Sequence, residues 1–299
     1  MNSIDIESKK FLGQPKNFVS IFNALLFDGK QVLKPEYLKD ENSELVMNVS
    51  SKHVDIIKRY EDGTYLDLFV IESQSYVDPS MVARVMEYES IARMRYIRQN
   101  FKNHVPISTR LPMILTVVLY VGESKWNAAK RLSELEIIHP GFEAMFNEFQ
   151  LNLIELNTNH KYNTGEKATQ DFFDLLSMIY RKQILKEDLD REFNRDALYF
   201  AYVVTKNKEL LSIYNKSEKG DVKVCRALDE MFEESTNKGI QMGIKQGFEQ
   251  GIEQGIEQGI ALKELFVYQT MLEKGFSVKA IASIFSVSEE SIKKLLMKA

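Results

Sequence analysis

The stretch DIIKRYEDGTYLDLFVIESQ, residues 55–74, decides the fold of this 299-residue chain. Two runs of β-prone residues flank the turn signal Asp62-Gly63, and this arrangement predicts a β-hairpin. The second run continues without a polar residue until its end, which is typical of a strand buried on both faces. It closes with Glu72 and Gln74, whose side chains share one face because strand side chains alternate.

The acidic residues of this hairpin predict a metal site. Mg²⁺ prefers oxygen ligands, and Glu72 could hold one together with a carboxylate from Asp55 on the partner strand if the two lie within about 7 Å. A metal-bound water is what phosphodiester cleavage requires. The alternative is that both acids cap strand ends in solvent. A two-residue turn would place His53 or Lys52 opposite Glu72, so the two carboxylates converge only if the first strand contains a bulge.

A basic helix follows the hairpin. Asp78 and Pro79 predict its start, as N-cap and first helical residue, and the helical pattern runs to about residue 102. At roughly 100° per residue, four basic side chains fall within a sector about 60° wide. No acidic residue occurs between positions 90 and 122, so phosphates of DNA are a natural partner for this basic stripe. The alternative is that the stripe only solvates an exposed face. Its residues are Arg84, Arg95, Arg98 and Lys102.

Composition limits the class of protein. Hydrophobic residues at 44% and charged residues at 27% are ordinary for a soluble globular chain. The net charge of −4 means that any DNA contact must come from a local patch. One cysteine, Cys225, excludes an intrachain disulfide and fits a reducing cytoplasm. The N-terminus lacks the apolar core of a signal peptide, and the apolar run at 113–121 is too short for a bilayer. We expect a cytoplasmic protein without membrane contact.

The order of the elements predicts an α/β domain over residues 1–160 and a helical region over 161–236. Apolar residues at helical spacing indicate the helices, and β-branched runs bounded by turn residues indicate the strands. In chain order we expect a helix at 17–27, strands at 44–50, 53–59 and 65–72, the basic helix at 78–102, and strands at 113–121 and 149–156.

A glycine repeat occupies residues 237–262. Six glycines cost a helix about 5 kcal/mol relative to alanine, yet residues four apart are helical neighbours, and a row of small residues lets another helix approach closely. The repeat therefore predicts a helix stabilised by a partner, which would make the protein a homo-oligomer; a flexible linker is the alternative. The repeated residues are Gly239, Gly243, Gly247, Gly251, Gly255 and Gly259.

The tail, residues 263–299, predicts two short helices that begin after the N-caps Ser277 and Ser288. Their apolar spacing suits a helix-turn-helix. Such a pair either engages DNA or is only structural.

Several separated motifs together resemble a known family. They are Ile71-Glu-Ser-Gln74, Tyr76-Val-Asp-Pro-Ser-Met81, Arg84-Val-Met-Glu-Tyr88, the strand Leu111 to Tyr120 with Trp126, and the Gly-Ile-Glu-Gln repeat with its helical tail. In this order they resemble the Rpn family of recombination-promoting nucleases, also described as PD-(D/E)XK nuclease family putative transposases. The resemblance implies a restriction-endonuclease-like core of order αβββαβ and Mg²⁺-dependent cleavage of DNA.

The resemblance also implies roles for individual residues. Asp55 and Glu72 correspond to the metal-binding acids, and Gln74 occupies the position where most of the wider superfamily has lysine. Gln74 can orient water or hydrogen-bond a phosphate oxygen, but it has no positive charge. The wider superfamily often adds an acid from the first helix, where this chain has Ser20. We expect a DNA endonuclease weakened by these departures; the alternative is a catalytically inactive DNA-binding or assembly protein that keeps the fold.

Overall fold

The computed structural model describes residues 3–40, 56–63, 66–102, 104–184, 188–217 and 220–297. The chain forms two compact units, Met1–Glu230 and Met231–Ala299. The first unit is mixed α/β and the second is helical, so the predicted α/β class with a helical C-terminal region is confirmed. The finer division at residues 160, 236 and 262 stays a prediction, and the strand predicted at 44–50 lies outside the described residues.

A five-stranded mixed sheet forms the centre of the first unit. Strands β1, β2 and β3 pair antiparallel, whereas β4 and β5 extend the sheet parallel to β3. Parallel neighbours need a crossover connection, and helix α4 (Met81–Asn100) supplies it between β3 and β4. The strands in sheet order are β1 Leu38–Asp40, β2 Ile56–Glu61, β3 Leu66–Gln74, β4 Ile114–Tyr120 and β5 Asn152–Glu155.

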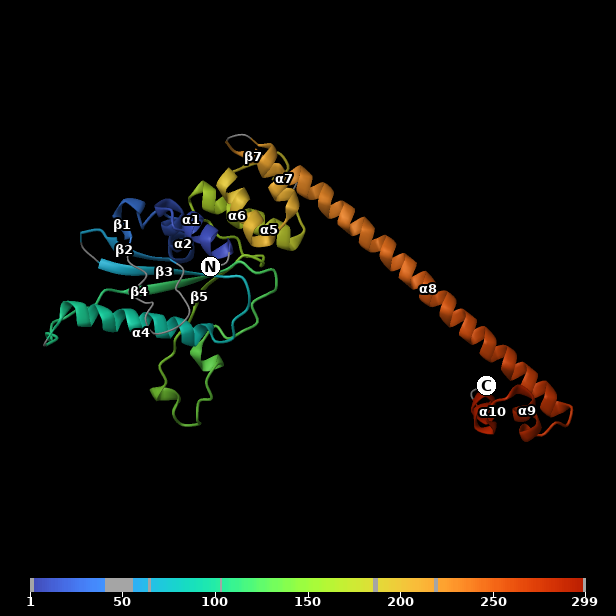
Figure 1. Cartoon of the computed structure of the whole chain (residues 1–299). Coiled ribbons are helices and arrows are strands. Elements are labelled where there is room, and N and C mark those ends of the chain that lie inside the picture. Colours follow the sequence, from blue (N-terminus) through green and yellow to red (C-terminus); the bar gives the residue numbers. More distant parts are fainter. Residues whose placement is uncertain are drawn as a thin grey trace. The chain divides into compact units, whose positions relative to one another are not determined.

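Helices cover both faces of the sheet (Figure 1). Helix α4 covers one face, where its Tyr88 packs in one cluster with Val70 of β3. On the other face, Phe22 of helix α2 (Pro15–Phe27) packs against Phe69, with ring centroids 4.8 Å apart. Because side chains alternate along β3, its even-numbered residues face α4. Glu72 therefore faces α4 as well.

The register of the hairpin corrects one prediction. Ile56 pairs with Ile71 and Glu61 with Leu66, in an unbroken antiparallel ladder. The expected two-residue turn is wrong, since four residues separate β2 from β3. Gly63 does have the positive φ of 89° that favours glycine, but within this longer loop. No bulge interrupts the paired part of β2.

The remaining helices of the first unit pack on its N-terminal part. Helix α1 (Ser3–Leu12), which the sequence pattern did not predict, contacts α6 through Phe11 and Phe200, with ring centroids 5.0 Å apart. Helix α5 contacts α2 where Ser20 Oγ donates a hydrogen bond to Thr169 Oγ1 over 2.8 Å. The further elements are η1 Pro35–Tyr37, η2 Leu132–Glu134, η3 Glu143–Met145, α5 Lys167–Arg181, β6 Glu192–Phe193, α6 Arg195–Thr205, α7 Lys208–Lys216 and β7 Val222–Lys223.

Helix α8 (Cys225–Glu273) starts in the first unit and carries the whole glycine repeat. Every residue from 233 to 260 is exposed. A Cβ atom added at any of the six repeat glycines would have no neighbour within 4 Å. Contacts within the described chain therefore do not require glycine at these positions.

The second unit has a small apolar core at its C-terminal end. Helices α9 (Val278–Phe285) and α10 (Glu289–Leu296) pack on the end of α8, where Tyr268 and Ile281 are buried. The side chains of Ser277 and Ser288 accept hydrogen bonds from the backbone of their helices, so both predicted N-caps are confirmed. Among the helices described here, none has both the length and the hydropathy to cross a membrane.

Cys225 is expected to be nearly inert in the folded protein. Its side chain is fully buried, and burial raises the pKa of the thiol to about 11. Since the thiolate is the reactive species, alkylation by iodoacetamide at pH 8 should be on the order of 10²-fold slower than for an unperturbed thiol of pKa about 8.5. The same protein in guanidinium chloride is the control. Equal rates in the two conditions would contradict the buried position.

Candidate metal and nucleic-acid site

Glu72 is buried inside the sheet. It pairs with Val118 of β4, and its exposed fraction is 3%. Strand β3 continues to Gln74, so Glu72 does not lie at a strand end in solvent. Its Oε1 atom accepts a hydrogen bond from Arg84 Nη2 of α4 over 2.8 Å. A buried carboxylate held by an arginine is the centre of this site.

Arg84 connects Glu72 to a second buried carboxylate. Its Nη1 atom donates to Asp78 Oδ2 over 2.6 Å, and its Nε and Nη2 atoms donate to the Tyr88 hydroxyl over 3.0 and 2.8 Å. Asp78 also accepts hydrogen bonds from the backbone N and the Oγ of Ser80. Asp78 is therefore not the N-cap of α4 as expected. The helix begins two residues later than predicted, at Met81, because Asp78 forms a local turn with Ser80 and pairs with Arg84.

The surroundings of Asp78 and Arg84 keep both of these groups charged. Burial opposes the charge of Asp78, but hydrogen bonds from Ser80 and Arg84 outweigh it and leave the pKa of Asp78 below its ordinary value. Burial likewise opposes the charge of Arg84, yet hydrogen bonds to Asp78 and Tyr88 and the attraction of Glu72 raise its pKa. Burial and the charge of Glu72 raise the pKa of Tyr88, despite its bond to Arg84. At neutral pH, Asp78 is thus a carboxylate, Arg84 is a charged guanidinium and Tyr88 is a neutral phenol.

Gln74 ends the strand with a buried amide. Its exposed fraction is 4%, and within the described residues its Nε2 atom has no hydrogen-bond partner. Such a buried N–H donor costs about 1–3 kcal/mol when unpaired and points to a water or another hydrogen-bond acceptor that satisfies it. Because alternate strand residues share a face, Gln74 and Glu72 lie about 7 Å apart along β3. The amide oxygen of Gln74 and the carboxylate of Glu72 are both oxygen ligands of the kind that Mg²⁺ prefers.

Asp55 lies outside the described residues, as do residues 53 and 54 of the predicted strand. Ile56 pairs with Ile71, and Asp55 and Glu72 are their respective chain neighbours. The approach of the two carboxylates within about 7 Å stays a prediction. Among the residues that the structure describes, no group of three or more His, Cys, Asp or Glu side chains could hold a metal ion.

The predicted basic stripe divides into two parts. Arg84 is bound within the buried network, with its side chain 13% exposed. Arg95 is half-buried, whereas Arg98 and Lys102 are exposed near the C-terminal end of α4. Their role in binding DNA stays a prediction.

Sequence reasoning missed Asp78 and Tyr88 as members of the site. Arg84 and Tyr88 are four residues apart, a helical neighbour relation that could have paired them. Ser20, which the resemblance aligns with an acid of the wider superfamily, is fully buried, and its Oγ donates to Asn17 O and Thr169 Oγ1. It therefore has a structural role in this chain.

A groove opens directly beyond Gln74. It has a volume of about 540 Å³ and lies at the carboxyl end of the parallel pair β3 and β4, where open α/β sheets bind their ligands. The groove is lined by Ser75, Tyr76, Val77, Tyr120, Glu123, Ser124, Lys125 and Asn127.

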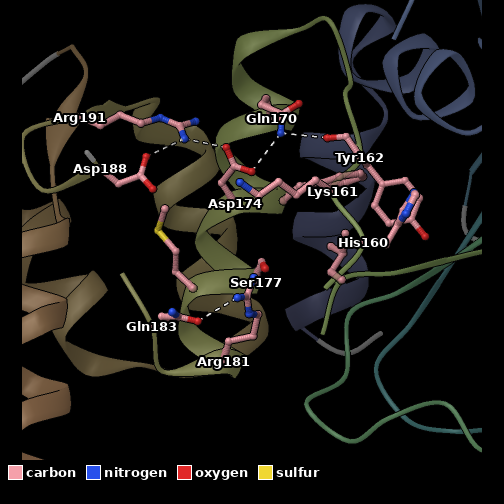
Figure 2. A pocket seen from close by; sticks show the side chains of 13 residues that line it. His160, Lys161, Tyr162, Gln170, Asp174, Ser177, Arg181, Gln183, Asp188 and Arg191 are labelled. Carbon is pink, nitrogen blue, oxygen red and sulfur yellow. Dashed lines mark hydrogen bonds and ion pairs between the residues drawn. The ribbon is translucent and has the colours of Figure 1, made fainter. Parts of the chain in front are cut away.

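A separate cavity of about 240 Å³ lies between α5 and the segment after β5. Figure 2 shows that Arg191 pairs with two carboxylates of the lining: it binds Asp174 over 2.7 Å and Asp188 over 3.6 Å. Gln170 donates both to Asp174 and to the carbonyl of Tyr162. These bonds give Arg191, Asp174 and Gln170 partners within the protein.

Comparison with known families identifies the class of this mixed α/β protein. A model of the family described as "Putative transposase, YhgA-like" matches residues 9–210. The chain belongs to this family, and the resemblance seen in its motifs is confirmed. The matched range contains the whole network of Glu72, Gln74, Asp78, Arg84 and Tyr88. No curated protein and no solved structure shows a significant match to the chain.

Proposed function

We propose that this protein is a Mg²⁺-dependent DNA endonuclease with a restriction-endonuclease-like PD-(D/E)XK core. The observation that carries the proposal is the buried pair of Glu72 and Gln74, beside a groove at the carboxyl end of a parallel strand pair. Membership in a family of transposase-like proteins supports DNA as the substrate. The free, buried thiol of Cys225 supports a reducing compartment, and we propose the cytoplasm.

In the proposed mechanism, Glu72 and Asp55 would hold Mg²⁺. When bound, the ion would supply a water of lowered pKa for attack on a phosphodiester. The Gln74 amide orients that water or donates to a phosphate oxygen. Arg98 and Lys102 hold the DNA backbone without reading its sequence. Arg84 is too enclosed to share this last task, because both sides of its guanidinium are bound to carboxylates.

A second candidate function is a catalytically inactive DNA-binding or assembly protein. Two observations favour it. Residue 74 has no positive charge to stabilise the transition state, and Glu72 is already paired with Arg84. In this reading the ion network only stabilises the fold.

The test is cleavage of supercoiled plasmid by the full chain, with Mg²⁺ and with EDTA. The proposal predicts nicked and linear products with Mg²⁺ and none with EDTA. Plasmid that stays supercoiled over the whole range of Mg²⁺ and Mn²⁺ concentrations, although the protein binds it, would favour the inactive alternative.

The exposed end of α4 gives a separate prediction. Replacing Arg98 and Lys102 by alanine should weaken DNA binding on every sequence and reduce the slope of log K against log salt by about two units, since each phosphate contact contributes about 0.9. Binding is measured in EDTA at several salt concentrations. The control replaces the exposed Lys16 and Lys30, which removes the same two positive charges elsewhere. Equal slopes in both variants would indicate that Arg98 and Lys102 only solvate the surface and do not contact DNA.

A further inference from the structure

We propose that Arg84 is a positioning residue, which holds the Glu72 carboxylate in the orientation that binds the metal and is itself oriented by Asp78. This inference rests on the proposed function, since it concerns the same carboxylate. It gives Arg84 a different role from the phosphate contact that its place in the basic stripe suggested.

The geometry of the guanidinium supports this role. Nη2 binds Glu72 over 2.8 Å and Nη1 binds Asp78 over 2.6 Å. The donors of arginine have a fixed planar arrangement, so two bonds in different directions define the orientation of the whole group. The Tyr88 hydroxyl adds a third partner, one turn further along α4. Arg84 thus links β3, the segment before α4, and α4 itself.

Burial separates this network from an ordinary surface ion pair. The side chains of Glu72, Asp78 and Arg84 are 4%, 9% and 13% exposed. Buried ion pairs gain little net stability over apolar packing, but they can fix one arrangement of their groups. A carboxylate that must receive a metal needs such a fixed arrangement, because the groups around the ligands of a metal control their orientation.

The chain contains a close comparison on the same helix. Arg93 binds Glu89 over 2.8 Å, the same distance as between Arg84 and Glu72. The Glu89 carboxylate is also buried, with its side chain 6% exposed, but Arg93 is 40% exposed and no second carboxylate binds it among the described ion pairs. Arg93 is therefore a matched control for the loss of an arginine from α4.

The experiment measures Mn²⁺ binding to the full chain by electron paramagnetic resonance, without DNA. Glu72→Gln serves as the reference for the site. We expect Arg84→Gln to weaken Mn²⁺ binding at least tenfold and Arg93→Gln to change it less than twofold. Arg84→Lys should recover only part of the affinity, since one ammonium cannot reproduce the two-sided planar contact.

The outcomes separate the inference from the function on which it rests. If Glu72→Gln binds Mn²⁺ as the native chain does, the proposed metal site is wrong and the inference falls with it. If Glu72→Gln loses binding but Arg84→Gln keeps it, only the inference is wrong. A gain of Mn²⁺ affinity in Arg84→Gln would also overturn it, because the arginine would then merely repel the metal.

Two further measurements keep the test valid if Arg84→Gln folds poorly. Asp78→Asn leaves the Arg84 contact with Glu72 in place but removes the charge that orients the arginine, and it should weaken Mn²⁺ binding several-fold. Unchanged binding in a folded Asp78→Asn variant would overturn the role of Asp78. In EDTA, folded Arg84→Gln should bind DNA with the native salt slope. If the slope of log K against log salt is smaller by about one unit, Arg84 contacts a phosphate of the DNA instead.

Discussion

Replacing Glu72 by alanine is expected to lower the rate of Mg²⁺-dependent plasmid cleavage by at least about 10³-fold. We propose that this carboxylate binds the metal, and a metal contributes several kcal/mol to the stability of such a transition state. Each 1.36 kcal/mol corresponds to a factor of ten in rate. DNA binding in EDTA should stay within about twofold of the native value, because the exposed Arg98 and Lys102 are unchanged. The rate is measured from the loss of supercoiled plasmid at saturating Mg²⁺.

Glu89→Ala is the control for this variant. Glu89 is also a buried carboxylate paired with an arginine of α4, over the same distance of 2.8 Å, so its loss should cost similar stability. The folded Glu89→Ala protein should cleave DNA at close to the native rate. Equal losses of activity in both variants would indicate that buried charge in general, rather than a metal ligand, is required.

The second large effect concerns self-association through α8. Six large apolar residues form a row beside the glycines and are between 48% and 69% exposed. Six glycines disfavour the helix by about 5 kcal/mol, and a half-exposed isoleucine gains roughly 1 kcal/mol on burial. We propose that a second copy of α8 covers this surface. The row consists of Ile240, Ile244, Phe248, Ile252, Ile256 and Ile260.

The four-residue period sets the geometry of such a pair. Rows of residues four apart drift about 40° per repeat around a straight helix, so they do not form the straight seam of a conventional coiled coil. They form ridges and grooves inclined to the helix axis, and two helices that interlock through such rows cross at about −50°. We therefore expect the row of apolar side chains on one copy of α8 to fit into the groove beside the glycines of the other copy.

Deletion of residues 239–262 should abolish concentration-dependent association of the full chain in analytical ultracentrifugation. A sharper variant replaces Gly247, Gly251 and Gly255 by alanine, which a single helix accommodates because the space beside each is open. A peptide spanning residues 238–262 should become more helical with these alanines, by about 3 kcal/mol of propensity, while the protein should associate more weakly. Stronger association of the alanine variant, or a monomeric native chain, would contradict the proposed pair.

The sequence predicted those features that depend on local pattern. Alternation placed Glu72 and Gln74 on one face of a buried strand, and the structure has both buried in β3. The N-caps Ser277 and Ser288 were predicted because the capping bond joins residues three apart. In each case the relevant partners are close in sequence or follow the strand period.

The features that were missed depend on contacts between elements. Asp78 precedes a proline, as a helix N-cap often does, but its carboxylate binds Arg84 instead of the first backbone amides of the helix. The helix therefore begins later, at Met81. Arg84 fits a basic stripe by its angle on α4, yet packing of α4 on the sheet turns it toward Glu72. The turn signal at Gly63 was read as a two-residue turn, whereas the paired ladder leaves a longer loop. Local patterns do not contain these tertiary contacts.

The most direct measurement is the anomalous scattering of Mn²⁺ in crystals of the full chain soaked in MnCl₂. The account predicts an anomalous peak about 2.1 Å from a carboxylate oxygen of Glu72, the distance at which ions such as Mg²⁺ bind oxygen, with Arg84 still bound to the other side of the carboxylate. The absence of a peak at Glu72 under saturating MnCl₂, with the carboxylate bound to Arg84 as before, would contradict the metal site on which the proposed function rests.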